Sequence, residues 1–330
     1  MNEVVILDVG HGNAAVIRHG DHTVVVDAPL RDRIVDVLRA EGVKRVRLVV
    51  ASHSDSDHCG GFIGLLLAPD IVVDEFRVNA DATRFTNTSR KKYWGDLKAA
   101  LQWANSEQGT RLRTELTAEV TDDISLEGLR LEVLLPEALL TMDGVGAQTA
   151  AGKVITPNAM SAVIRVVLEG DPLVLLTGDM DAEGLKRLVD AGQDIKSRVL
   201  VFPHHGGLPE GAAAGAKLAA FATDLMQMCA PQTVIFSLAR VGHANPRPEI
   251  VSAVRAAGAG VHIACTQLST HCSADLLADD GHLSSRPASG QAKGRCCLGS
   301  AVLLPGTGLA SPTRAMHEQA VAVLPARLCL

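Results

Sequence analysis

Short apolar runs alternate with polar turns along most of the chain. Three runs rich in valine and isoleucine come first, at residues 4–9, 13–20 and 22–28. Glycine-containing turns separate these runs. Runs of β-branched residues bounded by turn residues are typical of β-strands. The first 28 residues are therefore predicted to form three consecutive strands.

The next segment, residues 32–43, changes to a helical period. Ile34, Val35 and Leu38 fall at helical spacing, and Gly42 suits the end of the helix. A short, strongly apolar strand is expected at residues 45–52. This order of strand, helix and strand predicts an α/β architecture.

The same alternation continues to about residue 267. Further strands are expected at 71–79, at 129–136, at the start of 197–207, at the start of 232–258 and at 261–267. A basic amphipathic helix is expected at 89–109, a loop at 137–157 and another helix from about Pro248. Residues 160–170 and 173–179 are predicted to pair as a β-hairpin around a turn at Asp171–Pro172.

Polar clusters follow several of these predicted strands. They comprise Asp27, the stretch "SHSDSDHCGG" from Ser52 to Gly61, Asp179, and the pair His204 and His205. Loops at strand ends build the active sites of many α/β proteins. Imidazole and carboxylate groups together suit divalent metal ions. The sequence therefore favours a metal site over the simpler alternative, an acidic turn that caps a helix at Gly60–Phe62.

The spacing within the cluster suggests two metal positions. His53 and Asp55 lie two residues apart and point the same way if that segment is extended. Asp57 and His58 enter a turn and can point to a second position. Asp179 could bridge the two ions, and His204 or His205 could complete the second one.

Five motifs occur together in this order: "LDVGHGNAAVI", "VVVDA", "SHSDSDHCGG", "LLTGDM" and "PHHGG". The pattern His-x-Asp-x-Asp-His resembles the metal-binding signature of the metallo-β-lactamase fold superfamily. Aspartate at its second position resembles the subgroup typified by the hydrolase domain of the DNA-uptake protein ComEC. The resemblance covers roughly residues 1–262 and implies a four-layer αββα sandwich with a dinuclear site.

Residue roles carry over from this resemblance. It implies that His53 and Asp55 hold one ion, that Asp57 and His58 hold the other, and that Asp179 bridges them with His204 or His205 as the last ligand. It also implies supporting roles for Asp27 and for Asp8 beneath the site. Asn158 or Ser161 is expected to line the open coordination position. His243 is expected to contact substrate or donate a proton, the alternative being a loop histidine that caps the following helix.

The charges of this ligand set favour an anionic substrate. Two divalent ions carry four positive charges, and Asp55, Asp57 and Asp179 cancel three of them. The expected activity is phosphodiester hydrolysis by a metal-bridging hydroxide, which Asp57 could orient. Zn²⁺ and Mn²⁺ both suit the oxygen-rich ligand set. The alternatives are a lactone, thioester or lactam hydrolase on the same metals, and a non-catalytic module that the metals brace.

Composition limits the partners. The net charge of −6 argues against general attraction to nucleic acid or to anionic membranes. A local exception is a basic and aromatic stretch that contains Lys91, Lys92, Tyr93 and Trp94. This stretch could bind single-stranded nucleic acid or a nucleotide. The alternative is a solvated helix start with Trp94 packed inward. Without an apolar run of about 20 residues we expect no membrane insertion, and we expect a cytoplasmic location.

The last part of the chain is rich in cysteine. Residues 263–330 combine a polar stretch rich in glycine and serine with isolated apolar pieces, so we expect them to be an extension to the main unit, residues 1–262. Five of the seven cysteines lie in this extension. Cys265, Cys272, Cys296 or Cys297, and Cys329, with His271 or His317 in reserve, could bind a structural Zn²⁺. The alternative is a set of buried free thiols.

Overall fold

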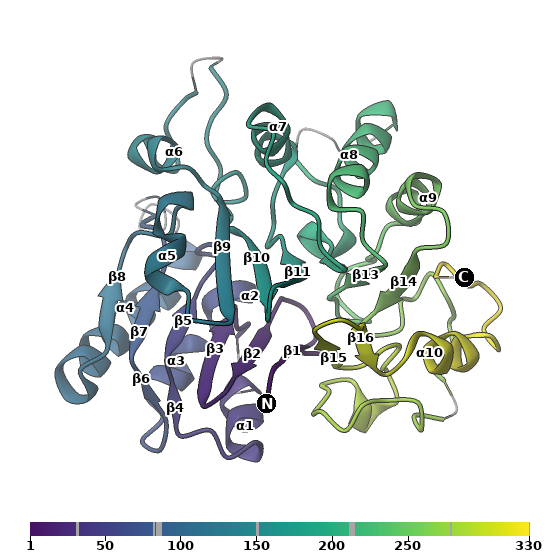
Figure 1. The fold of residues 1–330 in the computed structure, drawn as a ribbon, viewed down its shortest axis with the longest axis horizontal. Helices are drawn as coiled ribbons and strands as arrows, with labels where there is room; N and C mark the ends of the chain where they lie inside the picture. The colour runs from purple at the N-terminus through teal and green to yellow at the C-terminus, as the bar shows by residue number, and fades with distance from the viewer. Residues whose placement is uncertain are drawn as a thin grey trace.

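The computed structural model describes residues 1–30, 33–81, 83, 88–149, 152–210, 215–277 and 279–329. Its main elements are two large β-sheets (Figure 1). The eight-stranded sheet has the order β16 (Gly308–Ser311), β15 (Ala301–Leu304), β1 (Glu3–Ile6), β2 (Ala15–His19), β3 (His22–Val26), β5 (Leu48–Val50), β7 (Glu75–Arg77) and β8 (Arg111–Arg113). The six-stranded sheet has the order β14 (His262–Cys265), β13 (Thr233–Phe236), β12 (Val199–Val201), β11 (Asp171–Leu176), β10 (Val163–Leu168) and β9 (Leu129–Leu135). The short strands β4 (Arg45–Val46) and β6 (Val72–Val73) pair separately.

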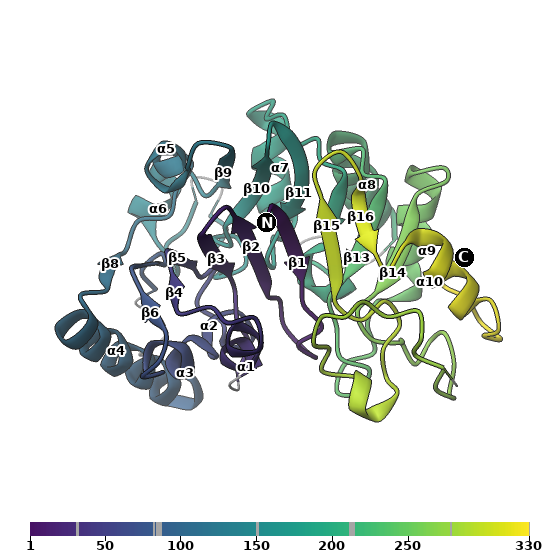
Figure 2. The same ribbon diagram turned by 60° about the horizontal axis from the view of Figure 1, so that its bottom comes forward.

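Helices cover the outer faces of the two sheets (Figure 2). The larger α-helices of the described chain are α1 (Arg33–Ala40), α4 (Thr88–Gln108), α7 (Ala182–Asp190), α8 (Gly215–Cys229), α9 (Pro248–Ala257) and α10 (Arg314–Val321). Shorter helical segments are α2 (Ser56–Cys59), α3 (Phe62–Leu66), α5 (Thr121–Ile124), α6 (Ala138–Asp143), η2 (Ala118–Val120), η3 (Pro203–Gly206) and η4 (Gln291–Lys293).

Alternating side chains on the strands divide the core into layers. On β1, Val4 and Ile6 point into a core shared with the other sheet, whereas Val5 points into a core shared with α1, α3 and α4. On β12, Val199 faces the first sheet and Leu200 faces α7, α8 and α9. Three apolar layers between four structural layers define an αββα sandwich, which confirms the predicted fold class.

The C-terminal residues are part of the sandwich, which corrects the boundary predicted at residue 262. Strand β15 pairs antiparallel with β1, aligning Val302 with Val5. Leu298 and Leu303 lie fully buried in the core between the sheets. Residues 263–330 therefore complete both sheets. Strand patterns in sequence do not reveal which distant strand is the partner, so this segment resembled an appendage.

Two further local predictions are wrong. The hairpin between β10 and β11 turns at Glu169–Gly170, where φ is 52° and 77°, and Asp171–Pro172 already belongs to β11. Positive φ at both central residues suits the twist of a two-residue hairpin. The expected loop at 137–157 contains helix α6, which buries Leu140 against a small separate cluster.

The C-terminal segment also contributes a buried pair of histidines. His262 Nε2 lies 3.0 Å from His317 Nδ1, and both rings are almost completely buried. Burial lowers the pKa of His262 to about 4, and burial with the charge of His262 lowers the pKa of His317 to about 3. Both rings are therefore neutral in the folded protein near pH 7.

This burial predicts a loss of stability in acid. Because the pKa of His262 is lower in the folded chain, the unfolded chain binds more protons between about pH 6.5 and pH 4. The contribution of His262 to the free energy of unfolding should therefore decrease as the pH falls through that window and level off below it. Relative to His262→Gln, the wild type should lose about 3 kcal/mol between pH 7.5 and pH 4. Urea unfolding at several pH values measures this difference. Replacement of the exposed His22 by Gln is the control, and parallel pH profiles for H262Q and wild type would contradict the prediction.

Candidate metal centre

The polar clusters predicted at strand ends come together at one edge of the sandwich. Asp27 follows β3, and the stretch from His53 to His58 follows β5. Asp179 follows β11, and the two adjacent histidines follow β12. Backbone hydrogen bonds join these loops, including Ala162 N to Ser52 O at 2.8 Å and His204 N to Gly178 O at 3.2 Å. The loops after β5, β11 and β12 therefore form one connected cluster.

Asp179 lies at the centre of this cluster, and its two carboxylate oxygens face different side chains. Oδ1 lies 3.2 Å from His58 Nε2 and 3.6 Å from His205 Nε2. Asp57 Oδ2 lies 3.5 Å from His205 Nε2. Ligand atoms of these four residues all lie within 4.8 Å of one another, a group that could hold a metal ion.

The other oxygen of Asp179 faces a second set. Oδ2 lies 3.1 Å from His204 Nδ1 and 3.9 Å from His53 Nε2. His53 Nε2 also lies 3.7 Å from Asp55 Oδ2. The other six residues predicted as metal ligands are thus gathered around the carboxylate of Asp179. The adjacent histidines divide between its two sides, with His205 beside the first set and His204 beside the second.

Unpaired polar atoms test whether this site fits a metal. Within the described residues, His53 Nε2, His58 Nε2, His205 Nε2 and Asp179 Oδ1 are buried without a hydrogen-bond partner. Leaving such groups unpaired is costly, so natural proteins seldom do so without a reason. Nitrogen and carboxylate oxygen atoms that converge on one point are a suitable donor set for a divalent ion. The residues present therefore fit the metals that the motif predicts.

The opposite nitrogen of each imidazole has a partner that orients the ring. His58 Nδ1 donates to Asp27 Oδ2 at 2.8 Å, and His205 Nδ1 donates to the carbonyl of Ser237 at 2.9 Å. In the neutral form of each ring, which is the form that binds a metal, the proton lies on Nδ1 and the Nε2 lone pair is directed into the site. Hydrogen bonds of this kind fix the tautomer and orientation of metal-binding histidines.

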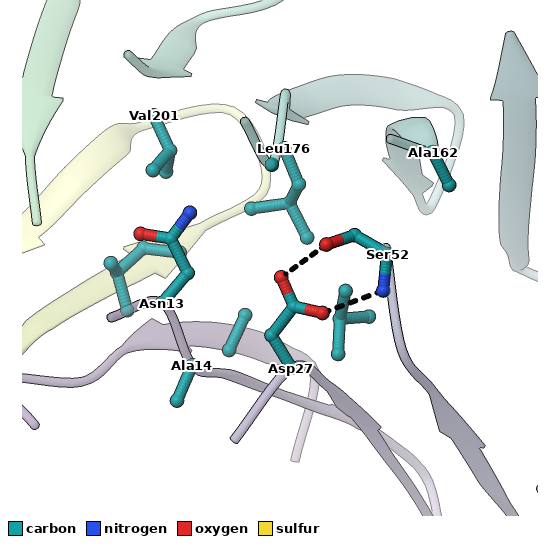
Figure 3. A pocket seen from close by; sticks show the side chains of 11 residues that line it. Asn13, Ala14, Asp27, Ser52, Ala162, Leu176 and Val201 are labelled. Atoms are coloured by element: carbon teal, nitrogen blue, oxygen red, sulfur yellow. Dashed lines mark hydrogen bonds between the residues drawn. The ribbon is translucent and has the colours of Figure 1, made fainter. Parts of the chain in front are cut away.

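Asp27 lies beside the start of the motif loop. Its carboxylate accepts hydrogen bonds from the Ser52 amide at 2.7 Å and the Ser52 hydroxyl at 2.8 Å (Figure 3). With the bond from His58, it thereby fixes the start of the motif loop. A small cavity of about 20 Å³ adjoins Asp27, Ser52 and Asn13 in the region between the sheets. Its volume corresponds to about one water molecule.

Ser161 and Asn158 differ in their contribution. Ser161 Oγ lies 3.3 Å from His53 Nδ1 and accepts a hydrogen bond from the amide of Asp179 at 3.0 Å. It therefore connects the His53 ring to the backbone of Asp179. Asn158 contributes its backbone carbonyl, which accepts from the Ser161 amide at 3.1 Å.

Backbone strain is concentrated at this site. Five non-glycine residues of the described chain have positive φ, and three of them are Asp27, His204 and His205, at 60°, 56° and 55°. Such conformations cost free energy and persist where the surrounding structure enforces them. The strained turn after β12 allows both adjacent histidines to face Asp179.

The ionisable groups of the centre shift one another strongly. Burial lowers the pKa of His58, but the charges of Asp179 and Asp27 outweigh it and raise that pKa well above its usual value. Burial raises the pKa of Asp179, but the positive charges of His58 and His205 bring it well below its usual range. For Asp57, the nearby imidazoles of His11 and His205 likewise outweigh burial and lower the pKa. The carboxylates are therefore ionised at neutral pH.

Two further histidines lie on the more exposed side of Asp57. His11 Nε2 is 3.2 Å from Asp57 Oδ2, and the His243 ring stacks on His11 with 4.1 Å between centroids. Burial and the charge of His11 lower the pKa of His243, which favours its neutral form. His11 was not among the predicted site residues. Gly12, the next residue, leaves no room for a side chain, since a Cβ atom there would lie 2.3 Å from the Asp57 carbonyl oxygen. The turn that carries His11 therefore packs directly against the motif loop.

Asp8 has a different role from the one predicted. Its carboxylate accepts hydrogen bonds from Gly10 N at 3.1 Å, Gln267 Nε2 at 2.8 Å and Gly290 N at 2.8 Å, and contacts Cys296 Sγ at 3.4 Å. Among the described residues these partners include none of the metal-ligand candidates. Asp8 therefore joins the N-terminal turn to the C-terminal segment.

The predicted aromatic platform for nucleic acid is wrong for Trp94. Its ring is buried in the core with Leu97 and Leu101, so no face of it is available to a base. The Tyr93 hydroxyl donates to the carbonyl of Ser54 and thereby supports the motif loop. Lys91 and Lys92 are exposed on α4.

The C-terminal cysteines are buried free thiols in this structure. Cys297 Sγ lies 3.2 Å from His317 Nε2, and burial raises the pKa of Cys265 well above its usual value. Within the described residues, Cys265, Cys272, Cys297 and Cys329 do not form a group with three ligand atoms within 4.8 Å of one another. A structural zinc in this segment stays a prediction.

The fold and the ligand set together define a protein class. The family model of the metallo-beta-lactamase superfamily matches residues 7–226. The chain therefore belongs to this superfamily, whose metallo-hydrolases share the sandwich described above.

Comparison with individual proteins adds more distant similarities. The chain is 28% identical over 211 residues to the competence protein ComA of Neisseria gonorrhoeae, an alignment that covers 62% of this chain and 23% of that protein. Among solved structures, YhfI of Bacillus subtilis matches with a TM-score of 0.45 and 11% identity over 79% of this chain and 95% of its own. The metallo hydrolase Igni18 of Ignicoccus hospitalis matches with a TM-score of 0.41 and 14% identity, over 78% and 92% of the two chains.

Proposed function

We propose that this protein is a phosphodiester hydrolase that uses two divalent ions, Zn²⁺ or Mn²⁺. The observation that carries the proposal is the position of Asp179. Its Oδ1 faces His58 and His205, and its Oδ2 faces His53 and His204. A carboxylate with a separate donor set on each side is suited to bridge two ions. Paired ions of this kind polarise a phosphoryl oxygen and lower the pKa of bound water.

The residues of the chain would supply orientation and charge. His58, His205 and Asp57 would hold one ion, and His53, Asp55 and His204 the other. Asp57 is the ligand candidate beside His11, with a side chain that is 27% exposed. It is therefore placed to orient a water molecule next to an incoming substrate. His243, stacked on His11 and neutral near pH 7, would contact the substrate or accept a proton at the rim.

An anionic substrate suits this charge balance better than a neutral one. Two divalent ions carry four positive charges, and the carboxylates of Asp55, Asp57 and Asp179 cancel three of them. The remaining positive charge attracts an anion. The resemblance to the DNA-uptake subgroup and the similarity to a competence protein support single-stranded nucleic acid or a nucleotide as the substrate. Because the chain spans 23% of the length of that relative, activities of the whole relative do not transfer directly.

A metal-reconstitution assay tests this proposal. Chelated protein should not hydrolyse bis(4-nitrophenyl) phosphate, and addition of Zn²⁺ or Mn²⁺ should restore hydrolysis with two equivalents of metal bound per chain. Elemental analysis measures the metal, and nitrophenolate release measures the reaction. If the metal-loaded protein opens lactones or thioesters but cleaves no phosphodiester, the carboxylic-ester alternative replaces this proposal. Less than one equivalent of metal would support the non-catalytic module.

A further inference from the structure

A groove of about 570 Å³ adjoins the candidate metal centre. Its size lies within the roughly 300–1,000 Å³ that is usual for small-molecule sites. His11 and Asp57, which belong to the centre, form part of its lining. Lys293 and Arg295 line it from the C-terminal segment, and Arg33 lines it from the start of α1. The groove therefore extends from the metal centre to basic residues of α1 and of the C-terminal segment.

The charge of this groove differs from that of the whole protein. Asp57 is the one acidic residue among its described lining residues, and its carboxylate lies beside His11 and His205. In the described part of the chain, the side chains of Arg33, Lys293 and Arg295 form no hydrogen bond or ion pair with the protein. A chain with a net charge of −6 thus presents three basic side chains and one carboxylate along a groove beside its metal centre. Such a concentration of charge attracts anions.

The structure also fixes the turn that carries two of these residues. The amide of Gly290 donates to Asp8 Oδ2 at 2.8 Å, and the amide of Arg295 donates to the Gly290 carbonyl at 2.9 Å. Asp8 Oδ1 accepts at the same time from the amide of Gly10, in the turn that carries His11. One buried carboxylate therefore holds the two walls of the groove together. Side chains on such supported turns are preorganised for binding.

We infer that this groove is a binding site for a second phosphate of the substrate, next to the phosphate that is hydrolysed. The inference rests on the proposed function and deepens it. Lys293, Arg295 and Arg33 would bind the non-reacting phosphate while the scissile group lies at the metal centre. The substrate is then a compound with at least two neighbouring phosphates, as in an oligonucleotide or a nucleoside diphosphate.

Equilibrium binding tests the groove independently of catalysis. The probes are fluorescein-labelled tetrathymidylate, followed by fluorescence anisotropy in EDTA, and ADP as a competitor. The double variant Lys293→Ala/Arg295→Ala should bind at least one probe about 10-fold more weakly, because two charge-assisted contacts are lost. The salt dependence of tetrathymidylate binding should also weaken. Weaker binding of the tetranucleotide by the double variant would indicate an oligonucleotide substrate. Weaker binding of ADP would indicate a nucleoside diphosphate.

The matched control replaces Lys44 and Lys217, two exposed lysines outside the groove, by alanine. It removes two positive charges and should bind both probes as the wild type does. Equal binding by K293A/R295A and wild type, or no binding of either probe by the wild type, would overturn the inference. Hydrolysis of bis(4-nitrophenyl) phosphate, which has one phosphate, separates the two proposals. Lost probe binding with no hydrolysis by the wild type would uphold the groove and reject the proposed function.

Discussion

Replacement of Asp179 by asparagine is expected to reduce kcat/KM for bis(4-nitrophenyl) phosphate by about 10³-fold or more. Asparagine keeps the shape of the side chain but removes the negative charge that faces His58, His205, His204 and His53. Both metal positions lose a shared ligand, so the metal content should fall below two equivalents. Steady-state kinetics and elemental analysis of the same preparation measure the two effects.

Asp181→Asn is the matched control for this variant. Asp181 is also a buried carboxylate, two residues further along the chain, but its Oδ1 accepts from Glu183 N at 2.9 Å and Gly184 N at 3.0 Å. It caps α7, and asparagine is an equally good cap. D181N should therefore retain metal and activity. A D179N protein that binds two ions and remains active would rule out the bridging role.

Leu303→Ala is expected to lower the free energy of unfolding by about 2–5 kcal/mol, the usual cost of such a truncation in a core. The Leu303 side chain is fully buried between the sheets. Leu304, the next residue on β15, is 36% exposed, so Leu304→Ala should cost less than about 1 kcal/mol. Urea unfolding of the two variants measures the difference.

The pair of leucine variants tests whether the C-terminal segment is part of the fold. If residues 263–330 were a separate appendage, neither change would alter the unfolding of the main sandwich. Truncation after His262 provides a second measurement, because it removes both β15 and β16 from the eight-stranded sheet. We expect that shortened chain not to fold. A cooperative unfolding transition for it would contradict the arrangement described above.

Local patterns predicted most strands and the polar loops that follow them. The run before Ser52 is buried and extended as expected, and Asp179 and the histidine pair follow strands that lie beside each other. These features depend on near neighbours in sequence. A continuous apolar run followed at once by polar residues is sufficient to predict a buried strand and the polar loop after it.

Long-range features were not predictable in the same way. The pairing of β15 with β1 depends on hydrogen bonds between residues at opposite ends of the chain, which no periodicity encodes. The role of Asp8 could not be inferred for the same reason, since Gly290 and Cys296 approach it only in the folded chain. The prediction that Trp94 binds nucleic acid was wrong because basic neighbours in the sequence do not show whether a ring points to solvent or into the core. The division of the adjacent histidines required the left-handed backbone at His204 and His205.

The position of β15 also determines when the protein can finish folding during synthesis. Strand β1 leaves the ribosome first, but Val5 can pair with Val302 only after about 300 further residues have been synthesised. At roughly 5–20 residues per second, this delay lasts about 15–60 s. Throughout it, one edge of β1 has no partner strand, and unpaired edges promote aggregation. The nascent chain therefore has a long interval in which a chaperone that covers this edge would raise the yield of folded protein.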